Sequence, residues 1–196
     1  MADISVEQIK KLKELSGAGL TDAKKALVEA NGDFDKALEA MRKKGLTKAE
    51  KRGDRETREG LVDAYIHDGR LGAIVEVNCE TSFVAKTDEF KTLVHQIAMQ
   101  VASMAPLYVS ENDIPEDVKA AKMKELKENF KGPENMKEQI LAGQAKKAFS
   151  DKVLMNQPYI LDDSKTVEQF IKEAIAKTGE NITVRQFKRI ELGVTE

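Results

Sequence analysis

Apolar and polar residues alternate over residues 71–79, which is the period of two that a strand with one buried face requires. Residues 61–67 form a second strand-like run, and Asp68 and Gly69 between the runs tolerate the positive φ of a tight turn. We therefore expect an antiparallel hairpin. A third strand-like run, residues 181–190, is expected to join it and complete a small sheet.

Other stretches carry apolar residues at helical spacing. The stretch after Thr87 predicts a long helix with Thr87 as its N-cap. Two similar patterns separated by Pro133 predict a helical hairpin over residues 116–150, and a capped pattern predicts a last helix over residues 166–177. Residues 61–196 are therefore expected to form an α+β core, with helices and the helical hairpin packed with the sheet.

The N-terminal region has the pattern of three short helices. Ser5 and Gln8 match a capping box, Asp33 is placed to cap the third helix, and Gly45 is placed to end it. Residues 1–45 are therefore expected to form a three-helix binding domain. Residues 46–60 mix basic and acidic side chains, which is typical of a solvated linker between domains.

Composition and charge exclude several classes of protein. The 196 residues are 41% hydrophobic and 34% charged, as in a soluble globular protein, and no apolar run reaches membrane-spanning length. The N-terminus is acidic where a targeting peptide would be basic, which favours the cytoplasm. The net charge of -2 gives no electrostatic reason to expect nucleic-acid binding.

Catalytic chemistry has little support in the sequence. The single cysteine, Cys79, would need His67 or His95 as its base, but no third orienting group is evident and Cys79 fits a buried strand position better. The sequence contains no phosphate-binding loop of the Gly-rich Lys-Ser/Thr type. We therefore expect a protein that is not an enzyme and needs no cofactor.

Thr81, Ser82, Phe83 and Val84 lie where the strand pattern ends and the next helix begins. Side chains at such a corner can project while the backbone is held at both ends. Phe83 could therefore act as a wedge in a partner. Residue type alone favours the other interpretation, in which Phe83 and Val84 fold back to cover the open end of the sheet, because most Phe residues belong to the core.

Four segments of the sequence resemble a known family. Residues 75–86 read Val-Glu-Val-Asn-Cys-Glu-Thr-Ser-Phe-Val-Ala-Lys and closely resemble the signature of elongation factor Ts. Three other segments also resemble that family: residues 16–27 with their Gly-Ala-Gly turn, residues 65–67 and residues 179–193. The match covers nearly the whole chain and is to a short form of the family. It implies a guanine-nucleotide exchange factor for elongation factor Tu. Such a factor would bind elongation factor Tu both with GDP and without a nucleotide.

The resemblance also implies roles for individual residues. In the family the corner is pushed into the GTPase, so Thr81, Ser82, Phe83 and Val84 would act on the magnesium of the partner, with Phe83 wedged between two of its helices. The chain itself would bind no metal. Three-helix units of this kind resemble ubiquitin-associated domains, which are binding modules.

A second contact is implied for the N-terminal bundle. Carried over by position, Leu20 and Thr21 follow the Gly-Ala-Gly turn, and Lys13 is the basic residue of the first helix. Thr21 lacks the apolar length that the family has there, which should weaken this contact. The residues alone leave open whether Leu20 is instead a core residue and Lys13 a solvated charge.

Ser82 stands where the family has Asp. The family's carboxylate could repel the nucleotide phosphates, in which case this chain lacks part of that driving force. It could instead be a local hydrogen-bond acceptor, a role that a serine hydroxyl can fill. The flanking residues fit the family pattern, which favours the second account.

Two further interpretations concern partners. A non-catalytic adaptor that uses only the N-terminal bundle is the alternative to an exchange factor. A homodimer is expected as the working form, because a chain with one core unit lacks the intramolecular neighbour that longer members of the family provide.

Overall fold

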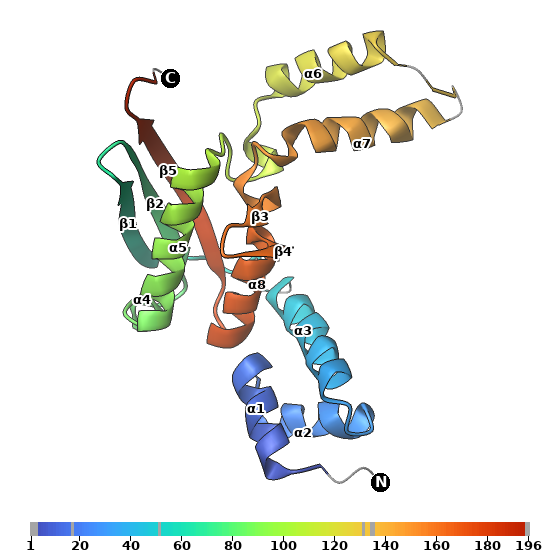
Figure 1. Ribbon diagram of the computed structural model, residues 1–196, viewed down its shortest axis with the longest axis vertical. Helices are drawn as coiled ribbons and strands as arrows, with labels where there is room; N and C mark the ends of the chain where they lie inside the picture. The colour runs from blue at the N-terminus through green and yellow to red at the C-terminus, as the bar shows by residue number, and fades with distance from the viewer. Residues whose placement is uncertain (1–3, 17, 51, 131, 134–135, 195–196) are drawn as a thin grey trace. The chain divides into compact units, whose positions relative to one another are not determined.

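The computed structural model describes residues 4–16, 18–50, 52–130, 132–133 and 136–194. It combines helices with a small antiparallel sheet, so the α+β prediction is confirmed (Figure 1). The chain divides into two compact units, which are described separately below. Unit 1 comprises residues 1–62, 76–94 and 169–184; unit 2 comprises residues 63–75, 95–168 and 185–196.

The N-terminal helices of unit 1 form a bundle with its own core (Figure 1). They are α1 (Val6–Ser16), α2 (Leu20–Glu29) and α3 (Phe34–Glu50). The predicted capping box is present, since the Gln8 N–H donates to Ser5 Oγ at 3.1 Å and the Ser5 N–H donates to Gln8 Oε1 at 3.0 Å. The apolar side chains that face one another in this core are Ile9, Leu12, Ala23, Ala26, Leu27, Ala37 and Met41.

Asp33 caps α3 as its sequence position predicts. Its Oδ1 accepts the Lys36 N–H at 3.1 Å, and the Lys36 ammonium lies 2.9 Å from Oδ2. The hydrogen bonds and charge of Lys36 lower the pKa of the Asp33 carboxyl below its usual value. The Asp33 cap therefore stays ionised to a lower pH than an unpaired Asp carboxyl would.

The third helix does not end at Gly45 as the sequence suggested. It continues to Glu50 and takes in the first part of the charged segment 46–60. A Cβ added at Gly45 would lie 3.2 Å from the Ala176 Cβ within unit 1. Gly45 thus allows a close approach between two segments, and the helix-favouring residues that follow it extend α3.

The sheet has the strand order β1-β2-β5. Its strands are β1 (Glu59–His67), β2 (Leu71–Cys79) and β5 (Ile182–Glu191), so the hairpin and the third strand appear where the sequence predicted them. Asp68 and Gly69 have φ values of 49° and 65°, as the predicted tight turn requires. In β2, Ala73, Val75, Val77 and Cys79 are buried and the residues between them are more exposed.

Apart from the short α4 (Ser82–Ala85), which the sequence did not predict, the helices of the core follow the predicted positions closely. Helix α4 precedes α5 (Asp88–Met104), and α8 (Val167–Thr178) precedes β5. In unit 2, α6 (Glu116–Glu128) and α7 (Lys137–Ser150) lie side by side and form the predicted helical hairpin (Figure 1). The short 3-10 helices η1 (Glu111–Asp113) and η3 (Leu154–Asn156) flank the hairpin.

Unit 2 also contains a feature that the sequence did not predict. The strands β3 (Pro158–Tyr159) and β4 (Asp162–Thr166) pair antiparallel. Next to β3, the buried side chains of Gln100 and Gln157 share a hydrogen bond of 3.1 Å. Gln100 also binds the backbone of Pro158 and Ile160. Buried amides with several partners specify one arrangement, which their isolated positions in the sequence do not reveal.

Candidate functional site

The corner after β2 is built from two consecutive helix caps within unit 1. Thr81 has an extended backbone, and its Oγ1 accepts the Val84 N–H at 3.4 Å at the start of α4. Thr87 Oγ1 donates to the Val84 carbonyl at 2.8 Å and accepts the Phe90 N–H at 3.2 Å, which starts α5. The chain therefore turns from strand to helix in a fixed conformation.

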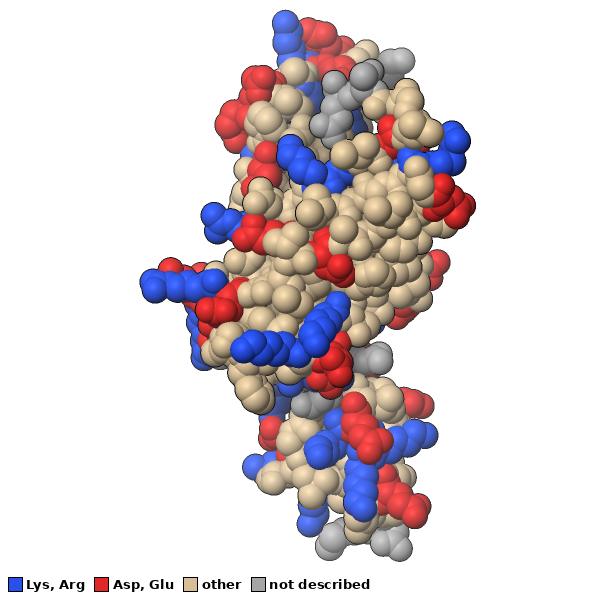
Figure 2. All heavy atoms as spheres, turned by 90° about the vertical axis from the view of Figure 1, so that its left-hand side faces the viewer, with Lys and Arg blue, Asp and Glu red and all other residues tan. Residues whose placement is uncertain are grey.

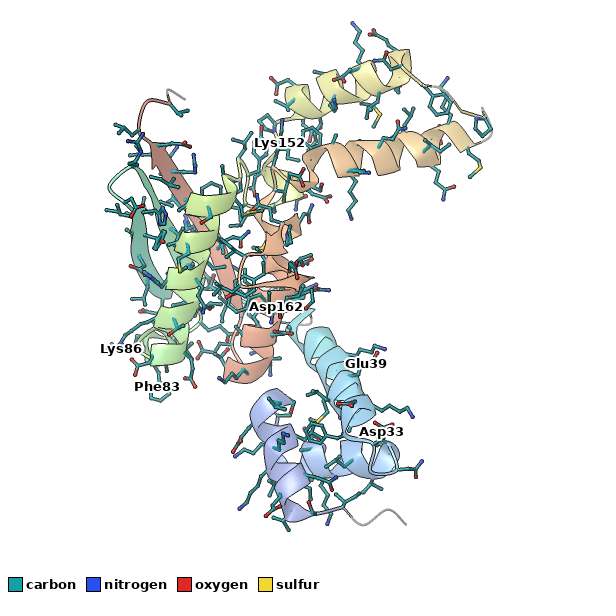
Figure 3. All side chains as sticks on the ribbon, in the orientation of Figure 1. Asp33, Glu39, Phe83, Lys86, Lys152 and Asp162 are labelled. Carbon is teal, nitrogen blue, oxygen red and sulfur yellow. The ribbon has the colours of Figure 1, made fainter. Side chains whose placement is uncertain are left out.

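Phe83 lies on α4 with 80% of its surface exposed, so it is not a core residue. Figure 3 shows its ring pointing away from the ribbon, on the same short segment as Lys86. Its neighbour Val84 is buried and supports the corner from within. Thr81 and Ser82 are exposed beside Phe83. The corner thus presents one large aromatic side chain on a backbone that the two helix caps keep in a fixed conformation.

Ser82 does not act as the local acceptor that the sequence interpretation favoured. Within the residues that the structure describes, its hydroxyl makes no hydrogen bond, and the capping acceptor of α4 is Thr81. The physical reason is position, because the N-cap residue precedes the helix and Ser82 is already its first residue. A carboxylate at position 82 would face outward from the corner.

The turn before β5 holds the corner through carboxylates. Glu180 Oε1 accepts the Thr81 hydroxyl at 2.6 Å and its Oε2 accepts the Thr81 N–H at 3.0 Å. Glu80 Oε1 accepts the backbone N–H of the buried Asn181 at 2.6 Å and lies 3.5 Å from Arg55 Nη1. The sequence pattern predicted a strand over residues 181–190, but it did not indicate that Glu180 and Asn181 would bind the residues of the corner.

Cys79 lies buried immediately before the corner, as predicted. Its thiol donates to the Thr81 carbonyl at 3.2 Å. Burial, and next the Glu180 carboxylate, raise the pKa of the Cys79 thiol to about 11. The thiol is therefore protonated at neutral pH, with about one molecule in ten thousand as the thiolate at pH 7. A nucleophilic role would need the opposite shift.

We expect Cys79 in the folded protein to react with a thiol reagent at least about 100-fold more slowly at pH 8 than in denaturant, because the reagent needs both the thiolate and local opening. Absorbance after mixing with a disulfide reagent measures this rate. A Ser103→Cys variant adds a thiol at an exposed position on α5 as the control. Equal rates for the two thiols would contradict the burial of Cys79.

The two histidines have their own partners in unit 2. His95 Nδ1 lies 2.9 Å from Asp63 Oδ2, and the Tyr65 hydroxyl lies 3.0 Å from His67 Nδ1. The ring of Tyr65 also packs edge-on against His95. Among the described residues, no group of three or more His, Cys, Asp or Glu side chains has an arrangement that would hold a metal ion.

The predicted contact residues of the bundle are exposed. Leu20 is the first residue of α2, directly after the N-cap Gly19, and it is 54% exposed. It is therefore not part of the bundle core. Thr21 and Lys13 are exposed as well, on α2 and α1. An apolar side chain, a threonine methyl and a cation are thus available on the surface of the bundle.

Comparison with known proteins decides the family. The family model for elongation factor Ts matches residues 3–194. The chain belongs to the elongation factor Ts family. Elongation factor Ts from Thermotoga maritima is 51% identical over 193 residues, which cover 97% of both chains. The protein of that name from Moorella thermoacetica is 50% identical, over 97% of this chain and 96% of the relative.

Elongation factor Ts proteins also occur in longer forms. The relative from Rippkaea orientalis is 50% identical over 199 residues, which cover 98% of this chain and 80% of that protein. Membership of the elongation factor Ts family makes this chain a translation elongation factor. In the residues that the structure describes, no helix is both long and apolar enough to cross a lipid bilayer.

Proposed function

We propose that this member of the elongation factor Ts family binds elongation factor Tu and promotes release of its GDP, in the cytoplasm and without catalysing a covalent step. The observation that carries the proposal is the exposure of Phe83. It is 80% exposed on a corner whose backbone is fixed by the caps at Thr81 and Thr87 and by the Glu180 carboxylate. Exposing a large aromatic side chain is unfavourable in isolation, so a rigidly presented one is well suited to a pocket of a partner.

In the proposed mechanism Phe83 enters between two helices of the GTPase near its magnesium ion. The ion's ligands and the phosphate-binding loop then lose the geometry that holds GDP. Phe83 supplies the apolar insertion, while Thr81 and Ser82 lie at the rim and Val84 supports the corner from inside. By linkage, a factor that prefers the nucleotide-free GTPase lowers the affinity for GDP by the same ratio.

The N-terminal domain, residues 1–45, is proposed to supply a second contact through Leu20, Thr21 and Lys13. Its exposed apolar side chain and cation support this role. The charged segment 46–60 would tether this domain to the core domain, residues 61–196. Two tethered contacts raise the effective concentration of the second once the first has formed.

Release of a fluorescent GDP from elongation factor Tu tests the proposal. Excess unlabelled GDP is added with and without this protein, and the decay of fluorescence gives the release rate. Exchange activity requires a rate that rises with the concentration of this protein and then saturates. A rate that stays at its spontaneous value throughout would reject the proposed function.

In the adaptor alternative, the N-terminal bundle of residues 1–45, on which Leu20 is exposed, would be the whole functional surface. It differs from exchange in where the activity resides. An adaptor would bind its partner through residues 1–45 without changing the GDP release rate. Exchange requires the Phe83 corner, so the release experiment separates the two functions.

We also propose that the working form is a homodimer. In unit 2, the end of the sheet carries several exposed apolar side chains, with Ile66 71% and Ile190 77% exposed; the others are Ile74, Leu192 and Val194. Figure 2 shows a broad uncharged area at the level of the sheet. An exposed apolar surface of this kind supports burial against a second copy of the chain in a two-fold pair.

At micromolar concentration, sedimentation should give a mass near that of two 21.8 kDa chains. The double variant Ile74→Lys, Ile190→Lys should shift it to one chain, because two cations would be buried without partners. Leu161→Lys, on the exposed turn between β3 and β4, is the matched control and should keep the dimer. A single 21.8 kDa species for the unmodified chain would dismiss the dimer.

A further inference from the structure

We propose that the turn formed by Glu180 and Asn181 is the positioning element of the exchange corner, which orients Phe83 without touching the GTPase. The inference rests on the proposed exchange function and goes beyond it, because it assigns a role to residues 99 positions away from the corner in sequence. It follows from the hydrogen bonds that converge on Glu80 and Thr81 within unit 1.

The first step concerns the hydroxyl of Thr81. Its proton goes to Glu180 Oε1 at 2.6 Å, so a lone pair is left to accept the Val84 N–H at 3.4 Å. The same carboxylate accepts the Thr81 N–H at 3.0 Å. Glu180 therefore fixes both the backbone of Thr81 and the direction of its capping lone pair. Hydrogen bonds to a charged acceptor are the stronger kind.

The second step leads from the cap to Phe83. A helix of only four residues has almost no stability of its own, so the direction of α4 depends on its cap and on the burial of Val84 and Ala85. Phe83 lies between the cap and these buried residues. Loss of the cap orientation would leave Val84 buried and let the exposed Phe83 ring sample more directions.

The third step concerns how Glu180 itself is held. It follows Gly179, which has a φ of 82° at the end of α8, and its N–H donates to Thr178 Oγ1 at 3.3 Å. The next residue, Asn181, is buried and donates its backbone N–H to Glu80 Oε1 at 2.6 Å. The turn is therefore anchored on both sides of the carboxylate that holds Thr81.

Asn181 extends the same network to the segment before β1. Its Nδ2 donates to the Gly53 carbonyl at 3.1 Å and to the Arg55 carbonyl at 2.8 Å. Arg55 also reaches Glu80 at 3.5 Å. The C-terminal part of the charged segment and the Phe83 corner thus share one anchor. The turn is therefore suited to keep the backbone of the corner in one conformation while the corner distorts the GTPase.

The test uses the full chain and elongation factor Tu loaded with fluorescent GDP. Glu180→Gln keeps the size of the side chain but loses one of the two acceptor oxygens. We expect the saturating release rate to fall about tenfold, as for the loss of one hydrogen bond to a charged group. The half-saturating concentration should change by less than about twofold, since the Phe83 ring and the bundle surface are still present.

Thr81→Val should give a similar fall, and Thr81→Ser, which retains the hydroxyl, should restore the rate. The double variant Thr81→Val, Glu180→Gln should be no slower than the slower single variant, because both act through one contact. Glu116→Gln on α6 is the matched control, because the exposed Glu116 carboxylate pairs only with Lys119, at 2.9 Å, among the described residues.

The outcomes separate the inference from the function on which it rests. If the unmodified chain does not accelerate release, the exchange function itself fails. If it does and Glu180→Gln matches it, the positioning role is overturned. A Glu180→Gln variant that melts more than about 5 °C lower, or effects of the two single variants that multiply in the double variant, would show a general structural role and overturn it as well.

Discussion

Phe83→Ala is expected to lower the stimulated GDP release rate by about 30-fold or more while the protein stays folded. The ring is the one large apolar group that the corner presents to a partner, and truncation of such a central aromatic side chain typically costs 2 kcal/mol or more, or about 30-fold. Because the ring is 80% exposed, its loss should change the free energy of unfolding by less than about 0.5 kcal/mol.

Stopped-flow release of fluorescent GDP and thermal melting by circular dichroism measure the two quantities together. Phe83→Tyr keeps the ring and should retain most of the activity. Leu161→Ala, another exposed apolar residue but in unit 2, is the matched control and should leave the rate unchanged. A Phe83→Ala protein with full activity would reject the wedge, and so would one that loses activity together with its helix content.

Gly60→Ala is expected to destabilise the protein by about 3 kcal/mol, which lowers the melting temperature by about 10 °C. A Cβ at this position in β1 would lie 2.2 Å from the Val77 carbonyl oxygen and 2.8 Å from the Asn78 Cα. Both neighbours are backbone atoms of β2 and cannot rotate away. The strands would have to separate locally, and with them the hydrogen bonds of the hairpin.

Gly143→Ala provides the contrast within the same chain. Gly143 lies on α7, and an added Cβ would meet nothing within 4 Å. Alanine there should be neutral or stabilise the helix by up to about 1 kcal/mol. Thermal melting of the two variants measures both effects. Equal melting temperatures for Gly60→Ala and the unmodified protein would show that β1 can shift without cost.

The sequence by itself determined most of the local structure. The hairpin strands, the turn at Asp68 and Gly69, and the caps at Ser5, Asp33 and Thr87 appear as predicted. These features depend on residues within about four positions of one another, so a period of two or 3.6 and a capping side chain are enough to specify them.

The tertiary structure alone decided how the corner is presented. Sequence patterns could not say whether Phe83 faces solvent or the core, nor that Val84 is buried and Ser82 makes no local hydrogen bond within the described residues. They also predicted neither the hydrogen bond between Thr81 and Glu180 nor the continuation of α3 past Gly45. Exposure and such contacts depend on which distant segments pack nearby, and no period or spacing along the chain records that.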